Sequence, residues 1–238
     1  MEGDYIDYLK GEYGPDRVWA VGPLKLLEDE GSGSGSSSTP ARHDVMTWLD
    51  QRRDGSVVFV CFGSWVSLTE NTVNVIAAGL ERSGVNFVWR VGDNDVVPSD
   101  FEERVGCRGY VIKGWAPQMQ ILRHRALASF LTHCGWNSAV EATSVGAPML
   151  TWPITGDQFI TAKLLVDHLG VAFRAGEGNR VVPEPDKLAQ ILRESLDNTR
   201  PEIVRVKKLS DAAFVAIKGG SSNGDLDDLA TRLVELKK

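Results

Sequence analysis

The chain contains 238 residues, of which 42% are hydrophobic and 24% are charged, and its formal net charge is −6. This length and composition are typical of one or two globular domains, and they exclude collagen-like, coiled-coil and wholly disordered chains. No apolar run reaches the roughly 18 residues needed to span a bilayer. The mild acidity, without a basic cluster, disfavours nucleic acid as a partner.

The N-terminal part of the sequence predicts a connecting segment followed by a linker. Residues 1–27 mix charged residues with a short strand candidate, Val18–Val21, which Gly22-Pro23 ends. Residues 28–43 include the Gly/Ser run Gly31–Ser38, and this composition is typical of a flexible linker. The Gly/Ser run is no phosphate loop, because it lacks the Gly-Lys-Ser/Thr ending and no apolar strand precedes it.

The cysteines and the N-terminus bear on the cellular compartment. Cys61, Cys107 and Cys134 are odd in number and do not have the spacing of zinc ligands. Cys61 and Cys134 end apolar runs, so we expect buried free thiols in a reducing compartment. The N-terminus has neither the positive region nor the apolar region of a signal peptide. We therefore expect a cytoplasmic protein.

From Asp44 onward, apolar runs alternate with helical patterns. A short helix over 44–50, with Asp44 as its N-cap, opens the series. The predicted strands are Ser56–Phe62, Asn86–Val91, Tyr110–Lys113, Leu127–Thr132, Pro148–Trp152 and Val171–Phe173. The predicted helices are Glu70–Arg82, Gln118–Arg123, Ser138–Val145, Phe159–His168, Glu184–Leu196, Ile203–Lys218 and Leu226–Leu236. Strands that are apolar on both faces and separated by helices indicate a parallel sheet covered on both sides. We predict an α/β fold: a Rossmann-like, doubly wound domain over 44–218 and a C-terminal helical arm over 219–238.

Ligands of such a sheet bind at the carboxyl ends of its strands. Gly63-Ser64 follows the first strand and offers a tight turn and a hydroxyl group. The fourth strand leads through His133 and Gly135 into a helix whose N-terminal amides and dipole favour an anion such as a phosphate. Glu141, one turn inside this helix, can accept hydrogen bonds from hydroxyls. These residues alone leave open a capped helix with a packed His and Trp and no ligand.

A longer pattern with fixed spacing includes this segment. It consists of Trp115-Ala116-Pro117-Gln118, His133-Cys134-Gly135-Trp136-Asn137-Ser138, Glu141, Gly146, Pro148, Trp152-Pro153 and Asp157-Gln158. These 44 residues resemble the signature of plant secondary product glycosyltransferases. Val18–Leu24, Trp48-Leu49-Asp50 and Phe62-Gly63-Ser64 are similar to stretches that precede that signature. The chain thus resembles the C-terminal half of a plant UDP-dependent glycosyltransferase of the inverting GT-B type.

The resemblance implies a UDP-sugar donor that is bound without a metal or other cofactor, and it assigns a role to each matching residue. Trp115 stacks on the uracil ring, and Ala116 contacts the uracil edge through its backbone. Gln118 and Glu141 reach the ribose hydroxyls. The implied diphosphate contacts are Ser64, His133, Asn137 and Ser138, and the implied sugar contacts are Trp136, Asp157 and Gln158. Gln158 favours UDP-glucose, with other hexoses, rhamnose and xylose as alternatives.

Three other features predict no additional site. Asp93-Asn94-Asp95 mimics the Asp-x-Asp metal motif of a different glycosyltransferase class, but we expect a solvated loop and no metal. The acidic residues at 225, 227 and 228 are expected to open the last helix, where they suit the helix dipole. His43, His124 and His168 have no partners at fixed spacing and are expected to be surface or packing residues.

The family resemblance also implies a missing part. In such enzymes a His of the N-terminal domain deprotonates the acceptor, and that domain forms most of the acceptor pocket. The segment before residue 28 is too short to be that domain, so we expect no catalytic base in this chain and no turnover without the N-terminal half. The acceptor is then a small hydroxylated plant metabolite such as a flavonoid. The helix 226–236 is expected to pack on the N-terminal domain, and without it we expect self-association or marginal stability.

Two alternatives to a donor domain of a working enzyme remain. The first is a non-catalytic, truncated module that binds UDP-sugar without turnover. The second is a nucleotide-sugar epimerase, which also uses GT-B architecture but which the signature over 115–158 disfavours.

Overall fold

The computed structural model describes residues 3–23, 40–180 and 182–236, and the side chains of the second range from residue 44 onward. The chain divides into two compact units. One unit combines the residues before 37 with those after 208, and the other comprises Ser37–Lys208.

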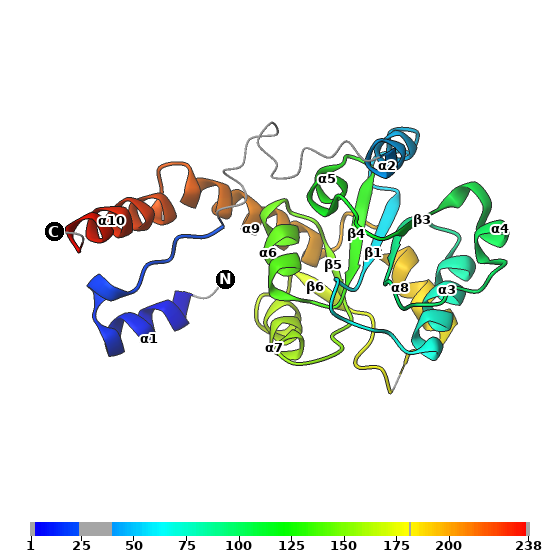
Figure 1. The fold of residues 1–238 in the computed structure, drawn as a ribbon, viewed down its shortest axis with the longest axis horizontal. Helices are drawn as coiled ribbons and strands as arrows, with labels where there is room; N and C mark the ends of the chain where they lie inside the picture. Colours follow the sequence, from blue (N-terminus) through cyan, green and yellow to red (C-terminus); the bar gives the residue numbers. More distant parts are fainter. Residues whose placement is uncertain (1–2, 24–39, 181, 237–238) are drawn as a thin grey trace. The chain divides into compact units, whose positions relative to one another are not determined.

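The larger unit contains a six-stranded parallel sheet (Figure 1). Its strands are β1 (Val57–Cys61), β2 (Asn86–Val91), β3 (Gly109–Lys113), β4 (Leu127–Thr132), β5 (Met149–Thr151) and β6 (Ala172–Arg174). The strand order is β3-β2-β1-β4-β5-β6, so the chain first winds outward from β1 on one side and then from β4 on the other. This is the predicted doubly wound α/β sheet, and its topological switch point lies between β1 and β4.

Helices connect the strands and cover both faces of the sheet. They are α2 (Pro40–Asp50), α3 (Glu70–Ser83), α4 (Phe101–Val105), α5 (Gln118–Arg123), α6 (Trp136–Ser144), α7 (Gln158–Lys163), α8 (Pro185–Glu194) and α9 (Pro201–Ile217), with short turns η3 (Gly106–Arg108) and η4 (Leu164–His168). Helix α9 begins in the larger unit and ends in the smaller one. No helix within the described ranges is both long and apolar enough to cross a membrane.

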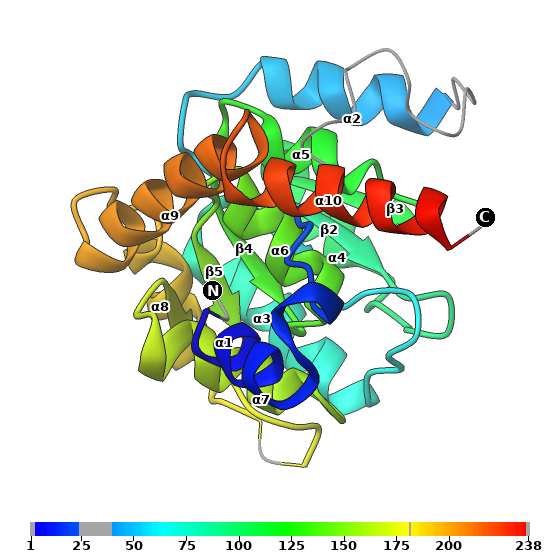
Figure 2. The same ribbon diagram turned by 90° about the vertical axis from the view of Figure 1, so that its left-hand side faces the viewer.

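The core lies on the two faces of the sheet. On one face, α3 and α8 lie side by side (Figure 1). They pack closely because Gly79 has no Cβ and admits the side chain of Leu188. Helices α5, α6 and α7 lie against the other face (Figure 2). All five residues of β1 are buried, and Phe59 stacks on Phe130 of β4 with ring centroids 5.0 Å apart. Burial on both faces explains why the strands are continuous apolar runs.

Several predicted boundaries differ from the structure. Helix α2 begins at Pro40, a residue suited to a first helical position, so Asp44 lies inside the helix and is not its N-cap. The segment 18–23 forms no strand. The predicted helix over 159–168 is α7 followed by a π-helical turn. Of the predicted linker over 28–43, residues 28–39 lie outside the described part of the chain.

The smaller unit joins the N-terminal segment to the last helix. It contains α1 (Gly3–Tyr13), which the sequence analysis did not predict, η1 (Pro15–Arg17) and α10 (Ser221–Glu235). Trp19 Nε1 donates to Asp228 over 2.7 Å, the Ala20 N–H donates to Asp225 over 2.7 Å, and Ser222 Oγ donates to the Gly22 carbonyl over 2.7 Å. Helix α10 begins four residues before Asp225, so the acidic residues do not open it. Asp225 and Asp228 instead hold the N-terminal segment.

Candidate functional site

The switch point between β1 and β4 is occupied by one imidazole. His133 follows β4 directly and is 9% exposed. A Cβ placed on Gly63, after β1, would lie 2.7 Å from the Nε2 atom of this ring, and one placed on Gly135 would lie 2.5 Å from the same atom. Both positions therefore require glycine, because any side chain there would overlap the ring. The two loops and the ring form one close-packed unit at the carboxyl edge of the sheet.

His133 is uncharged at neutral pH. Burial lowers the pKa of the His133 imidazole to about 4, although the charge of Asp157 and the backbone of Cys61 act in the opposite direction. Its Nδ1 atom is buried and has no hydrogen-bond partner among the described residues. A neutral imidazole can donate one hydrogen bond and accept one, so this ring can still donate to a ligand oxygen.

The backbone between β4 and α6 makes a sharp left-handed turn. Cys134 has a φ of 64°, a conformation uncommon for a residue other than Gly. Its N–H donates to Thr132 Oγ1 over 3.3 Å, and its Sγ donates to the Thr132 carbonyl over 3.6 Å. Burial raises the pKa of the Cys134 thiol to about 12, so this thiol stays protonated and serves packing.

The N-terminus of α6 offers backbone donors to this edge. The first hydrogen bond of the helix runs from the Ala139 N–H to the Gly135 carbonyl over 3.0 Å, and no side chain caps the helix. The N–H groups of Trp136, Asn137 and Ser138 therefore have no acceptor within the helix. Together with the positive end of the helix dipole, they form a site suited to an anion.

A polar cluster joins α5 to α6. Gln118 Nε2 donates to Ser138 Oγ over 3.1 Å and to Glu141 Oε2 over 2.7 Å. Ser138 is 8% exposed and Glu141 is 6% exposed, so both hydrogen bonds are shielded from water. The amide thus orients a buried carboxylate, which is a strong acceptor for hydroxyl groups.

The loop after β3 carries an exposed aromatic ring. Trp115 is 67% exposed and follows Gly114, which has a φ of 92°. The Gln118 N–H donates to the Ala116 carbonyl over 2.8 Å in a tight turn. This hydrogen bond engages the carbonyl of Ala116. The N–H of Ala116 is then the backbone group of that residue that a ligand can contact. The indole face is available for stacking on a planar ring.

The loop after β5 brings two more of the predicted residues to this edge. Gln158 is 8% exposed, and its Oε1 accepts from the Ile154 and Thr155 N–H groups over 2.9 and 3.0 Å. These bonds engage the side-chain oxygen and leave the amide nitrogen as the remaining polar group of the side chain. Asp157 is exposed at the start of α7, and so are Ser64 in the loop after β1 and Trp136 and Asn137 at the start of α6.

The sequence analysis missed Arg90, the charged residue within β2. Its guanidinium donates to the Gly114 carbonyl over 2.8 Å and to the Gly63 carbonyl over 2.9 Å. It also pairs with Asp93 over 3.2 Å. A charged residue in the apolar run NFVWRV was the only signal in the sequence.

The Asp93-Asn94-Asp95 segment has a structural role. Asp93 pairs with Arg90, while Asp95 accepts from the Leu68 and Gly92 N–H groups over 3.1 Å each. Among the described residues, no group of three or more His, Cys, Asp or Glu side chains is arranged to hold a metal ion. These contacts tie the loop after β2 to the segment that follows β1.

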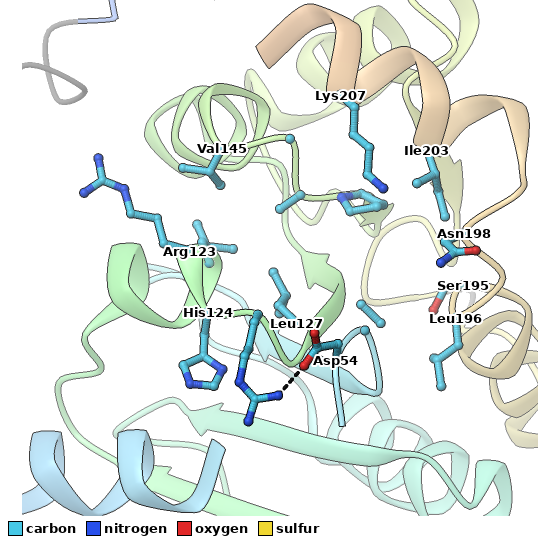
Figure 3. A pocket seen from close by; sticks show the side chains of 17 residues that line it. Asp54, Arg123, His124, Leu127, Val145, Ser195, Leu196, Asn198, Ile203 and Lys207 are labelled. Atoms are coloured by element: carbon cyan, nitrogen blue, oxygen red, sulfur yellow. Dashed lines mark hydrogen bonds and ion pairs between the residues drawn. The ribbon is translucent and has the colours of Figure 1, made fainter. Parts of the chain in front are cut away.

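A separate hollow of about 430 Å³ lies at the opposite, amino edge of the sheet (Figure 3). It is lined by the turns that precede β1, β4 and β5 and by the junction of α8 and α9. Arg125 pairs there with Asp54, and Lys207 also lines the hollow. Helices of this sheet end at that edge, where cationic side chains offset the negative ends of their dipoles. The hollow contains none of the predicted site residues.

Comparison with known families identifies the chain. Residues 23–180, more than half of the sequence, match the family described as "UDP-glucoronosyl and UDP-glucosyl transferase". The chain belongs to this family. The UDP-glycosyltransferase resemblance drawn from the signature is thereby confirmed.

Curated relatives of this UDP-glycosyltransferase chain come from plants. A flavonol 3-O-glucosyltransferase of Arabidopsis thaliana is 48% identical over 99% of this chain and 51% of its own length. A flavonol 7-O-rhamnosyltransferase of the same plant is 42% identical over 98% of this chain and 57% of its own length. The chain thus spans about half the length of these relatives.

Solved structures agree with the fold. Arabidopsis thaliana UGT89C1 complexed with UDP-L-rhamnose matches with a TM-score of 0.86 and 44% identity, over 98% of this chain and 56% of that one. Phytolacca americana UGT2, complexed with UDP-2fluoro-glucose and pterostilbene, matches with a TM-score of 0.77 and 34% identity, over 90% of this chain and 46% of that one. The GT-B expectation for the fold is confirmed.

Proposed function

We propose that this chain is the donor-binding half of an inverting UDP-glycosyltransferase that transfers glucose from UDP-glucose to a hydroxyl of a small plant metabolite such as a flavonoid. The observation that carries the proposal is the neutral, buried His133 imidazole held between Gly63 and Gly135 at the N-terminus of α6. This unit offers several neutral donors to a diphosphate.

The diphosphate lies at the switch point in this proposal. His133, Ser64, Asn137 and Ser138 donate to its oxygens, with the free amides at the start of α6 behind them. When the bond to the sugar breaks, the departing UDP gains negative charge, and fixed donors stabilise that charge without reorganising. These donors and the helix dipole supply the stabilisation that a metal ion supplies in other enzymes, so we propose metal-independent transfer.

The nucleoside lies across the loops after β3 and along α6. Trp115 presents an exposed face for the uracil ring, and the Ala116 backbone contacts its edge. Gln118 and Glu141 form the ribose site, because the hydrogen bond between them already orients a buried carboxylate. A carboxylate of this kind accepts well from the two hydroxyls of a ribose.

The sugar lies near Trp136, Asp157 and Gln158. The exposed Asp157 carboxylate accepts from sugar hydroxyls, and the amide nitrogen of Gln158 donates to them. Glucose is supported by Gln158 and by the name of the glucosyltransferase relative. Rhamnose is the competing donor, because one relative is named a rhamnosyltransferase and UGT89C1 was solved with UDP-L-rhamnose.

The acceptor side of the reaction belongs to an N-terminal domain in this proposal. The chain spans about half the length of its relatives, and the base that deprotonates the acceptor is expected in the other half. UGT89C1 was also solved with quercetin, which supports a flavonoid acceptor. The alternative is a module that binds UDP-sugar without turnover.

The free thiols of Cys61, Cys107 and Cys134 support a cytoplasmic location.

Calorimetric titration of the chain with UDP, UDP-glucose and UDP-rhamnose tests the donor site. We expect UDP to bind, and we expect UDP-glucose to bind more tightly than UDP-rhamnose. Trp115→Ala should weaken the binding of all three ligands. Lys207→Ala, in the hollow at the opposite edge, is the matched control and should leave UDP affinity unchanged. If UDP fails to bind at millimolar concentration, or if Lys207→Ala alone weakens it, the proposed site is wrong.

A second experiment separates the enzyme from the binding module. The chain is mixed with a separately produced N-terminal half of the flavonol 3-O-glucosyltransferase relative, and quercetin glucoside is assayed with UDP-glucose. Product that requires both halves supports the donor half of an enzyme. UDP binding without product in the mixture favours the binding module.

A further inference from the structure

We infer that Arg90 is a positioning residue that fixes the loop after β1 and the loop after β3 relative to each other, and thereby couples diphosphate binding to base binding. This inference rests on the proposed function, because the two loops carry the proposed phosphate and base contacts.

Arg90 occupies the position in the sheet that this role requires. Strand β2 lies between β1 and β3, and in the register Arg90 pairs with Cys61 on one side and with Ile112 on the other. Its side chain is 10% exposed. From this position, Nε donates to the Gly114 carbonyl over 2.8 Å, and Nη1 donates to the Gly63 carbonyl over 2.9 Å. One guanidinium therefore joins the loops of both neighbouring strands.

Each bonded carbonyl belongs to the residue directly before a proposed ligand contact. Gly63 precedes Ser64, and Gly114 precedes Trp115. Both glycines are left-handed, with φ of 72° and 92°, so each lies at the point where the loop changes direction. Fixing these carbonyls fixes the direction in which the next residue leaves the turn. Arg90 thus sets the separation between the hydroxyl of the phosphate loop and the indole of the base loop.

The far end of the β1 loop is held by the same segment. Asp95 accepts from the Leu68 N–H over 3.1 Å and from the Gly92 N–H over 3.1 Å. Asp93, two residues earlier, pairs with Arg90 over 3.2 Å. The residues that follow Ser64 are therefore anchored at both ends to β2 and its loop.

The chemistry of the two bonds calls for arginine. A planar guanidinium presents several N–H groups in a fixed fork, so one side chain can reach two carbonyls in different directions. Lysine has a point charge on a flexible stem and cannot reproduce this fork. If Arg90 served stability alone, its removal would weaken all ligands to the same extent. A positioning role instead predicts a loss only for ligands that engage both loops at once.

Hydrogen exchange of the ligand-free chain tests the tie itself. In Arg90→Ala and Arg90→Lys we expect amides of residues 63–68 and 114–116 to exchange about tenfold faster or more, with the strands unchanged. The matched control is Arg104→Ala, because Arg104 also bonds through its guanidinium, to Glu81 and Asp100, but touches neither loop. If only one loop responds, or if Arg104→Ala gives the same pattern, the tie does not exist.

Calorimetry with uridine and UDP tests the functional consequence. UDP engages both loops, whereas uridine engages only the base loop, so the ratio of their affinities measures the coupling. We expect Arg90→Ala and Arg90→Lys to lower UDP affinity about tenfold while changing uridine affinity less than twofold.

The outcomes separate the two levels of the argument. UDP binding by the unaltered chain together with an equal loss for uridine and UDP overturns the coupling role of Arg90 and leaves the proposed function intact. No UDP binding by the unaltered chain overturns the proposed function and the coupling inferred from it. The positioning role is supported if the Arg90 variants keep their unfolding midpoint in urea while the ratio of UDP affinity to uridine affinity falls.

Discussion

The contact between His133 and Gly135 yields a prediction whose magnitude follows from the structure. In Gly135→Ala the new Cβ would lie 2.5 Å from Nε2 and 3.0 Å from Cε1 of the His133 ring. Gly135 has φ −58° and ψ 140°, which any residue adopts, so the substitution adds no backbone strain. The ring cannot retreat across the crevice, because it already fills the space beside Gly63. Overpacking of this kind destabilises a folded domain by about 1–3 kcal/mol.

The same displacement should weaken ligand binding. A shift of the ring by about 1 Å removes the proposed donor from the phosphate, and a hydrogen bond to a charged group contributes about 1.5–3 kcal/mol. We therefore expect urea unfolding to show the loss of stability and calorimetry to show UDP affinity reduced about tenfold or more. Gly84→Ala is the control, because Gly84 has φ 70° and open space around it, so it adds strain without touching the site.

A double-mutant cycle decides whether the contact is the cause. In a His133→Ala background the Cβ at position 135 meets no ring, so Gly135→Ala should cost almost nothing in stability. The expected coupling energy between the two positions is then about equal to the overpacking penalty. Additive effects of the two substitutions would refute the close-packed arrangement.

Three further predictions concern the same edge. Trp115→Ala should weaken UDP binding about tenfold or more and Trp115→Phe less, because a stacked base contributes about 1–3 kcal/mol; calorimetry measures both. Because the folded pKa of His133, about 4, lies below the usual value of about 6.5, the unfolded chain binds more protons between these pH values, and stability should fall by up to about 3 kcal/mol as pH drops from 6.5 to 4. Urea unfolding of His133→Gln should lack that part of the pH dependence. Gln118→Ala should reduce the UDP preference over 2′-deoxy-UDP and destabilise the domain by about 1 kcal/mol, because the hydrogen bond from Gln118 to Glu141 is lost.

Much of the sheet could be predicted from the sequence because burial on both faces leaves continuous apolar runs. Strands β2 and β4 and helix α5 have the predicted bounds, whereas α2 begins four residues earlier than expected. Its start was missed because Asp44 resembles an N-cap, while Pro40 lies next to the Gly/Ser run. Helix α1 has no buried residue, so its sequence carries no apolar stripe to announce it.

The proposed site residues could be predicted because they belong to a signature with fixed spacing. What the sequence cannot convey is the way in which they are held. Arg90 acts on the carbonyls of Gly63 and Gly114, and any residue has a carbonyl, so the sequence around these positions contains no mark of the contact. The hydrogen bonds that Gln158 Oε1 accepts cannot be predicted from the sequence for the same reason, since the donors are backbone N–H groups.

Backbone direction, more than the shape of any cavity, organises the proposed site. The loops after β1 and β3 turn through left-handed glycines, but the loop after β4 turns through Cys134, where a side chain makes the same conformation cost about 1–2 kcal/mol. The cost is offset locally, because Cys134 is fully buried and both its N–H and its Sγ donate to Thr132. A glycine would relieve the strain but would lose that packing and free the turn. The strained residue therefore holds His133 on one side and the N-terminus of α6 on the other in fixed directions, as the proposed diphosphate site requires.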